Sequence, residues 1–256
     1  SQERLEKIPT ILKRFRRSVL AAACSGRLTA DLREKNPNFE PAEELLKRIQ
    51  EERKQKLKSK YKEPQQPLEE DLVNLPKLPK NWSYTFINPL FSLSKKGMKT
   101  GPFGSMLKKH EHKLKGVPVL GIENISSMTF ISGNKIFITE EKAEKLKEYK
   151  VENGDILISR SGTVDEVCVV PESLGEARIS TNLIRLSLNQ EGMLPFFFCM
   201  LFNGSQMVLD QVSSLCKGST RNFLNQKILS SVIFPLPPLE EQKEIVKRVE
   251  ALFKKC

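Results

Sequence analysis

Both ends of the chain carry the apolar spacing of an amphipathic helix, and this constrains the fold more than any other feature. Between Leu5 and Ala22, apolar residues recur at alternating intervals of three and four, the pattern of a coiled coil or helical bundle. A second apolar stripe occupies residues 239–255, directly after Pro237 and Pro238. Neither stripe can bury itself alone, so we expect the two helices to pack together, within one chain or between two copies.

The expected seam between these helices consists of apolar side chains on one face of each. Pro9 lies inside the N-terminal run, so that helix either begins or kinks there. Gly26 follows where the apolar pattern fails, which favours a helix stop. The predicted seam residues are Leu5, Ile8, Leu12, Phe15, Val19, Ile245, Val249 and Leu252.

Between the two ends, the composition of the sequence divides the chain into three segments. A second helix is expected from Pro41 onward, either largely solvated or resting on the next domain by a narrow apolar stripe. Residues 61–80 are rich in proline and poor in apolar groups, which indicates a semi-rigid linker. From residue 81, short β-branched and apolar runs bounded by glycine and proline predict a mixed sheet.

The predicted fold class is α+β, with one mixed α/β domain and long N- and C-terminal helices that form a coiled-coil-like spacer. Within that domain, the run Phe196–Phe198 is expected to be buried core rather than a base-stacking platform. The expected segments are 1–30, 31–80, 81–236 and 237–256. The expected strands lie at 117–122, 129–138, 155–159, 167–170 and 183–188, and the expected internal helices at 195–203 and 205–214.

Composition points to a polyanionic partner. The net charge is +11 and the pI is about 9.4, which favours nucleic acid first and an anionic membrane surface second. No stretch approaches the roughly 18 consecutive apolar residues of a membrane span. The five cysteines are scattered and never form a C-x-x-C pair, which is typical of reduced thiols in the cytoplasm. His110 and His112 are too few for a metal site, so no metal is expected.

Tests for catalytic motifs are negative. Asn88-Pro89-Leu90-Phe91 comes close to the box with which adenine methyltransferases hold their target, but it lacks the second proline and is better explained as a turn. The sequence contains no phosphate-binding G-x-x-x-x-G-K-[ST] loop and no G-x-S-x-G nucleophile elbow. We therefore expect a chain that is not an enzyme and that carries no cofactor.

Three separated blocks of sequence point to one family. They are residues 5–29, Gly154–Thr163 and Pro237–Gln242, the last reading Pro-Pro-Leu-Glu-Glu-Gln. These blocks resemble the specificity subunits of type I DNA restriction-modification systems. The first is similar to the family's central spacer helix, the second to the core strand and loop of a target recognition domain, and the third to its repeated conserved region.

The chain departs from the family pattern in two respects. Such subunits usually carry two target recognition domains, and this chain has residues for one. Its end, residues 252–256, also resembles what in the family normally precedes residues 3–6 within a central spacer. The resemblance thus implies either a half subunit that works as a homodimer or a piece of a longer subunit. It further implies double-stranded DNA as ligand, methyltransferase subunits as partners and a possible restriction and translocation subunit. Alternatives are a stand-alone DNA-binding regulator and a helical scaffold for protein contacts.

With the resemblance as guide, DNA contacts are expected on three loops, 95–101, 160–163 and 217–222. Arg160 and Arg221 are the candidates for guanine edges, and the lysines would position phosphates. Each loop has the alternative of a solvated turn, and the strand that carries Arg178 and Asn182 could instead bury them in sheet hydrogen bonds. The predicted DNA-binding residues are Lys95, Lys99, Thr100, Lys108, Lys109, Arg160, Ser161, Thr163, Arg178, Asn182, Lys217, Ser219, Thr220 and Arg221.

Overall fold

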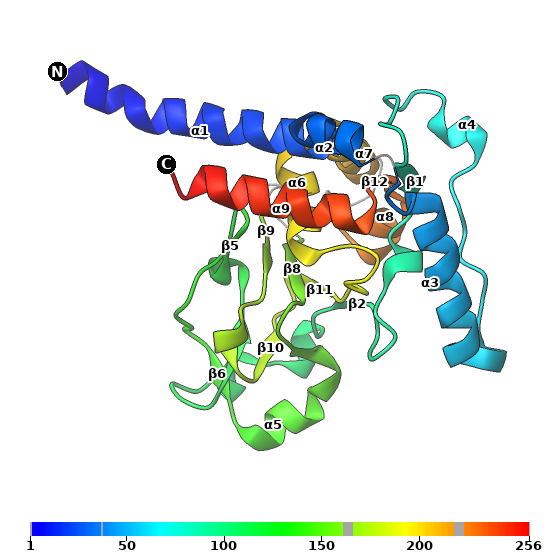
Figure 1. The fold of residues 1–256 in the computed structure, drawn as a ribbon. Coiled ribbons are helices and arrows are strands. Elements are labelled where there is room, and N and C mark those ends of the chain that lie inside the picture. The colour runs from blue at the N-terminus through cyan, green and yellow to red at the C-terminus, as the bar shows by residue number, and fades with distance from the viewer. Residues whose placement is uncertain (1, 37, 161–165, 218–222, 256) are drawn as a thin grey trace.

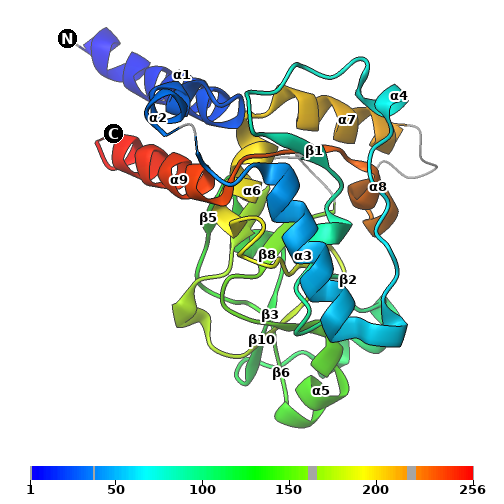
Figure 2. The ribbon, with the colours of Figure 1, turned by 45° about the vertical axis from the view of Figure 1, so that its right-hand side comes forward.

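The two terminal helices lie side by side along one face of the protein, as Figures 1 and 2 show from two directions. The structure is a computed structural model that describes residues 2–36, 38–160, 166–217 and 223–255, with residues 2–7 described as backbone alone. Helix α1 spans Gln2–Cys24 and helix α9 spans Leu239–Phe253. Their contact within one chain confirms the predicted helices at both ends.

Helix α1 continues through Pro9 and stops at Gly26, whose φ of 73° is the left-handed conformation that glycine adopts without strain. Its C-terminal half is buried through Val19, Leu20 and Ala23 and packs on helix α6, which spans Pro195–Gly204. Its N-terminal half extends beyond the rest of the chain (Figure 1). The seam is therefore closed at one end of α1 and open at the other.

The seam residues divide accordingly. Val19, Ile245 and Val249 are buried, whereas Ile8 and Phe15 keep 44% and 39% of their surface exposed. Leu12 and Leu252 are partly buried, and the side chain of Leu5 lies outside the described residues.

Two short helices follow α1: the 3-10 helix η1, Arg27–Thr29, and helix α2, Ala30–Lys35. Helix α3 comes next and spans Ala42–Leu57. It buries one narrow stripe, Ala42, Leu45, Leu46 and Ile49, against the domain, which matches the second of the two arrangements predicted for it. The proline-rich stretch that follows is not uniformly extended, because it contains the one-turn helix α4, Glu69–Leu72.

Two four-stranded sheets form the centre of the domain. One is antiparallel, in the order β2-β11-β8-β9, and the other is mixed, in the order β6-β3-β10-β7 with β3 and β10 parallel. The strands of the first sheet are Met98–Thr100, Leu183–Leu186, Ile156–Ser159 and Val167–Val169. Those of the second sheet are Phe137–Ile138, Val117–Leu120, Ala177–Ile179 and Lys150–Val151.

Two further antiparallel pairs complete the strands. Strand β1, Ser83–Thr85, pairs with β12, Phe234–Leu236, so the beginning and the end of the domain meet in one ladder. Strand β4, Ile125–Ser126, pairs with β5, Thr129–Phe130. The predicted strand 129–138 is therefore wrong as one element, since β5 and β6 are separate strands with a loop between them.

Three more helices belong to the domain. Helix α7, Gln206–Lys217, corresponds to the second internal helix that was predicted. Helices α5, Glu140–Lys145, and α8, Gln226–Ser231, were not predicted. Short 3-10 turns include Asn88–Leu90, so the near-methyltransferase sequence there forms a turn, as expected.

The largest core joins the helices to the first sheet. Phe197, Phe198 and Phe202 are fully buried in it beside Phe234, which confirms the core role predicted for the phenylalanine run. The same core contains residues of α1, α3 and α9, so the predicted segments share one packed interior. A second cluster lies beneath β3 and β10. No described helix is both long and apolar enough to cross a membrane.

Candidate nucleic-acid interface

Described residues beside two of the three predicted loops meet directly after strand β8. The backbone N–H of Arg160 donates to the Asn182 carbonyl over 2.9 Å, in the turn between β10 and β11. The Leu224 N–H donates in turn to the Arg160 carbonyl over 3.1 Å. Arg160 thus lies between the β10–β11 turn and the segment that leads into α8, whose described part begins at Phe223.

The third predicted loop joins the same place through the end of β2. The Gly101 N–H donates to the Leu183 carbonyl over 3.0 Å, and the Thr181 hydroxyl donates to the Pro102 carbonyl over 2.6 Å. A Cβ on Gly101 would lie 1.8 Å from the Ser180 carbonyl oxygen, so only glycine permits this approach. We call the assembled surface, residues 96–104, Arg160, 180–182 and 223–226, the loop edge.

The loop edge encloses a cavity of about 320 Å³. Its polar side chains come from β2, from the β10–β11 turn and from α8, and two aromatic rings contribute to its wall. A hydrogen bond of 2.9 Å from the Gln226 amide nitrogen to the Thr100 hydroxyl connects α8 to β2 beside it. The lining residues are Lys96, Lys99, Thr100, Gly101, Phe103, Tyr149, Arg160, Thr181 and Gln226.

Two of the predicted phosphate-binding lysines have acidic partners in the domain. Lys95 contacts the carboxylates of Glu152 and Asp155 at 2.6 and 2.9 Å. Lys99 pairs with Glu148 and lies 4.7 Å above the centre of the Tyr149 ring. The hydrogen bond from each lysine lowers the pKa of its glutamate partner, Glu152 or Glu148. A phosphate at either lysine would therefore compete with a carboxylate already in place.

Other predicted cations point to solvent. Lys108, Lys109 and Lys217 are exposed, as is Lys96, and none of the four forms an ion pair with any residue that the structure describes. Lys217 ends helix α7, one residue before the loop at 218–222. Exposed ammonium groups of this kind suit phosphate contacts, which need charge more than fixed geometry.

The two described arginines of the prediction both serve the fold. Arg160 donates from Nη1 to the Thr181 carbonyl over 3.1 Å and from Nε to the Leu224 carbonyl over 3.4 Å. Arg178 is only 2% exposed and donates to the Ala143 carbonyl over 3.0 Å. Burial excludes Arg178 from any groove contact, so its predicted role is corrected to a structural one, whereas Asn182 is exposed.

Several predicted contacts fall on positions that are not described. The described neighbours of the two segments, Arg160 and Phe223 among them, belong to the loop edge. The predicted residues outside the described part of the chain are Ser161, Thr163, Ser219, Thr220 and Arg221.

The loop edge also contains residues that the sequence interpretation missed. Phe103 keeps 78% of its surface exposed and lines the cavity together with Gln226, and the ring of Tyr149, outside the loop edge, contributes to the same wall. A phenylalanine between proline and glycine beside a basic loop was a readable signal for an exposed aromatic contact. Gln226 gave no such signal, because helix α8 itself was not predicted.

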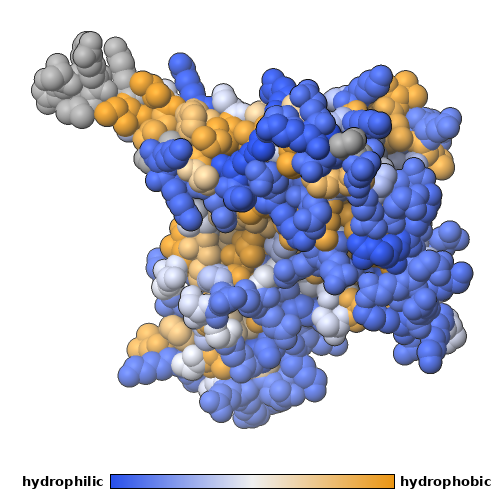
Figure 3. All heavy atoms as spheres, in the orientation of Figure 1, coloured by the Kyte–Doolittle hydropathy of each residue, from blue (hydrophilic) through white to orange (hydrophobic). Residues whose placement is uncertain are grey.

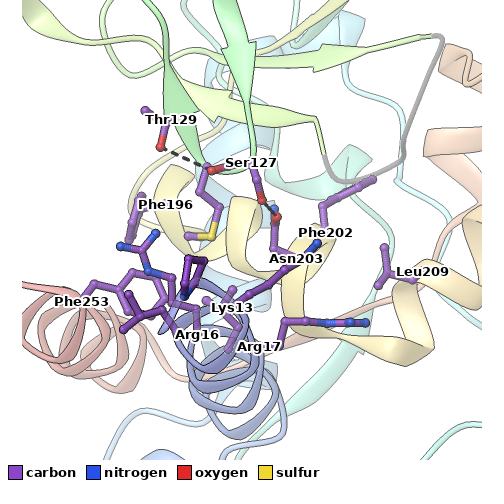
Figure 4. Close-up of a pocket in the computed structure, with 14 residues that line it drawn as sticks. Lys13, Arg16, Arg17, Ser127, Thr129, Phe196, Phe202, Asn203, Leu209 and Phe253 are labelled. Atoms are coloured by element: carbon purple, nitrogen blue, oxygen red, sulfur yellow. Dashed lines mark hydrogen bonds between the residues drawn. The ribbon is translucent and has the colours of Figure 1, made fainter. Parts of the chain in front are cut away.

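A groove of about 910 Å³ separates the open half of α1 from the domain (Figure 4). Lys13, Arg16 and Arg17 approach it from α1, and the Arg16 guanidinium lies 5.3 Å from the centre of the Phe253 ring of α9. The β4–β5 turn and α6 form its other wall, where Ser127 hydrogen-bonds Asn203. Figure 3 shows apolar surface on the projecting part of α1 above this groove.

The Pro-Pro-Leu-Glu-Glu-Gln segment connects the terminal helices to the domain through buried hydrogen bonds. The Glu241 carboxylate, fully buried, accepts hydrogen bonds from the Thr29 hydroxyl at 2.6 Å, from the Trp82 indole N–H at 2.8 Å and from Arg33. The Gln242 amide accepts from Leu194 N–H over 2.9 Å. The sequence motif therefore holds α9, the N-terminal region and the domain in one arrangement.

The chain is similar to known proteins in sequence and in fold. A family model described as type I restriction modification DNA specificity domain matches residues 79–256. The chain is 28% identical over 254 residues to the type I restriction enzyme EcoBI specificity subunit of Escherichia coli, covering 99% of this chain and 46% of that protein. It is 28% identical to the StySPI specificity subunit of Salmonella potsdam, covering 99% of this chain and 45% of that protein.

The chain thus spans about half the length of the curated relatives it matches. A chain in a solved structure of the type I R-M system is similar in fold, with a TM-score of 0.53 and 18% identity. That similarity covers 90% of this chain and 50% of the other.

Proposed function

Because the chain belongs to the type I restriction modification DNA specificity domain family, we propose that it reads one half of a split DNA site through the loop edge. The observation that carries this proposal is the convergence of three described segments, distant in sequence, on that one surface: the end of β2, Arg160 with the β10–β11 turn, and residues 223–226. The alternative function is a protein scaffold on which the basic surface is incidental. A scaffold would not require these segments to converge.

The chemistry of the loop edge suits duplex DNA. Exposed Lys96, Lys108, Lys109 and Lys217 would neutralise phosphates and fix the position of the domain. Side chains near the cavity would then face base edges in the major groove, where each base pair presents a distinct pattern of donors and acceptors. In this proposal Arg160 positions the loops instead of contacting guanine, since its guanidinium already bonds two carbonyls.

The helices would set the distance between two reading domains. Helix α1 has 23 residues, and at 1.5 Å per residue it spans about 35 Å, close to one turn of duplex DNA. A partner helix along the open half of α1 would cover Ile8, Ile11 and Phe15, which are exposed. We propose that two copies pair there as a homodimer, which makes the two half-sites identical and the gap between them a function of helix length.

The enzymatic work would belong to partner subunits. In this proposal the chain is the non-catalytic reading component, with no cofactor of its own, in the cytoplasm together with the DNA. Methyltransferase subunits would dock on the helices, and a restriction subunit would join that complex. The basic and apolar lining of the groove beneath α1 supports a protein contact at that place.

Selection from a pool of randomised duplexes tests the proposal directly. The full chain should enrich a defined base pattern, and a variant with Lys96, Lys108 and Lys109 changed to glutamine should bind all sequences more weakly without altering that pattern. Enrichment of no sequence by the folded chain would contradict the reading function and favour the scaffold. Binding as a lone regulator would appear as high affinity without any effect of a methyltransferase subunit.

A further inference from the structure

The loop edge presents one side-chain amide that is held in place and still has hydrogen-bonding groups to offer. Gln226 is the first residue of helix α8, whose N-terminus is capped by the Asn225 side chain accepting from the Ile228 N–H over 2.9 Å. The Gln226 amide nitrogen donates to the Thr100 hydroxyl over 2.9 Å. An amide has two N–H groups and a carbonyl, so one N–H and the carbonyl oxygen remain for a ligand.

The neighbouring polar groups of the cavity are occupied or offer only donors. Arg160 is committed to the carbonyls of Thr181 and Leu224, and Lys99 to Glu148. The Thr181 hydroxyl donates to the Pro102 carbonyl. Lys96 has donors alone. The Thr100 hydroxyl accepts from Gln226, and the Tyr149 hydroxyl contacts the Met106 sulfur. Among the described side chains that line the cavity, Gln226 is the planar amide that offers a donor and an acceptor side by side.

A paired donor and acceptor on one amide matches adenine in the major groove, where N7 accepts and the N6 amino group donates. The thymine opposite presents its C5-methyl group, which prefers an apolar neighbour. Phe103 lines the same cavity and is 78% exposed. An exposed phenylalanine costs hydration free energy unless a partner covers it, and a methyl group beside an amide contact is such a partner.

We propose that Gln226 and Phe103 together read one A·T base pair, with the Gln226 amide on the adenine edge and the Phe103 ring against the thymine methyl. The proposal rests on the proposed function, because it takes the loop edge to face the major groove. Thr100 acts as a positioning residue, since its hydroxyl fixes the direction of the Gln226 amide.

The test is selection from randomised duplexes with the full chain and single variants, read position by position. Gln226→Leu should reduce the preference for one A·T pair over other base pairs about tenfold. The preferences at the other positions should stay unchanged. Phe103→Ala should weaken preference at the same base pair. Gln206→Leu, which removes a glutamine that bonds Asp210 on helix α7, is the matched control and should select the parent's pattern.

Gln226→Glu gives the sharper result, because a carboxylate accepts from the cytosine amino group. This nearly isosteric variant should change the selected base at that position from adenine to cytosine, an outcome that a purely structural role of Gln226 does not produce. A parent pattern that Gln226→Leu and Gln226→Glu both reproduce in full, with unfolding midpoints equal to the parent's, would overturn the assignment. If the folded parent enriches nothing, the proposed function fails instead, and the two failures are distinct.

Discussion

Glu241 shows how much one buried side chain can hold together. Its carboxylate binds Thr29, Trp82 and Arg33 at once, and these partners come from the N-terminal region and from the start of the domain. Buried charges are costly unless they are paired and hydrogen-bonded, and here the pairing crosses more than 150 residues of sequence.

Replacing Glu241 should therefore destabilise the fold. Glu241→Ala leaves the Trp82 N–H and the Arg33 guanidinium without their acceptor, and we expect a loss of about 3 kcal/mol in the free energy of unfolding. Glu240→Ala is the matched control, because the neighbouring glutamate is exposed and, among the residues that the structure describes, forms an ion pair with Lys243 alone. This variant should change stability by less than about 0.5 kcal/mol. Urea unfolding measures both, and equal effects of the two variants would refute the role of the buried carboxylate.

Arg178 illustrates what residue type alone does not reveal. The sequence identifies an arginine on a strand, but whether its side chain faces a groove or the interior depends on the layer that covers the sheet. The structure supplies that layer in helix α5, where the Ala143 carbonyl accepts from Arg178.

Substituting Arg178 should lower the stability of the fold without changing the bases that the protein selects. Arg178→Met keeps the aliphatic stem but removes the buried hydrogen bonds from the guanidinium to the Ala143 and Ala177 carbonyls, and we expect a loss of about 2 kcal/mol in the free energy of unfolding. The base pattern selected by the remaining folded protein should be unchanged. A change of preferred base in this variant, measured below its unfolding temperature, would restore Arg178 as a contact.

At the scale of elements, the long patterns were predictable and the short ones were not. Helices α1 and α9 have several turns of apolar spacing, which gives a strong periodic signal. Helices α5 and α8 have six residues each, too few for periodicity. Their local signals are the N-cap residues Thr139 and Asn225, whose side chains accept from Lys142 and Ile228, and in α5 also the acidic first turn. The loop edge could not be predicted as a surface, since the contacts that assemble it are long-range.

Introducing a charged residue should have different effects at the two ends of the helical seam. Phe15 is 39% exposed on the open half of α1, whereas Val249 is fully buried against the core. Phe15→Glu should leave the unfolding temperature nearly unchanged and lower the mass measured by light scattering to that of one chain, because it removes the proposed helix contact. Val249→Glu should unfold the protein, because a buried unpaired charge costs several kcal/mol.

Each half of this prediction has its own refutation. A Phe15→Glu protein that keeps the parent's assembled mass would remove the open half of α1 from the interface. A Val249→Glu protein that melts at the parent's temperature would contradict the burial of α9 in the core.

At the scale of the whole molecule, the charge distribution predicts strong salt dependence. Lys96 on the loop edge is exposed, as are Lys108, Lys109 and Lys217 elsewhere in the domain, and the net charge is +11. A protein that makes 6–10 phosphate contacts loses roughly 10³–10⁵ in affinity between 50 and 200 mM salt. Binding measured by fluorescence anisotropy across this range should fall steeply, and a curve that is nearly flat would show that phosphates contribute little.

The measurement that tests the central claim most directly is a map of methylated adenines in cells that express a partner methyltransferase subunit, with and without this chain. If the chain supplies specificity as a homodimer, a palindromic motif split by a fixed gap should appear only when the chain is present. The Gln226→Leu variant should broaden one position of each half-site equally. A methylation pattern that is the same with and without the folded chain would contradict the account.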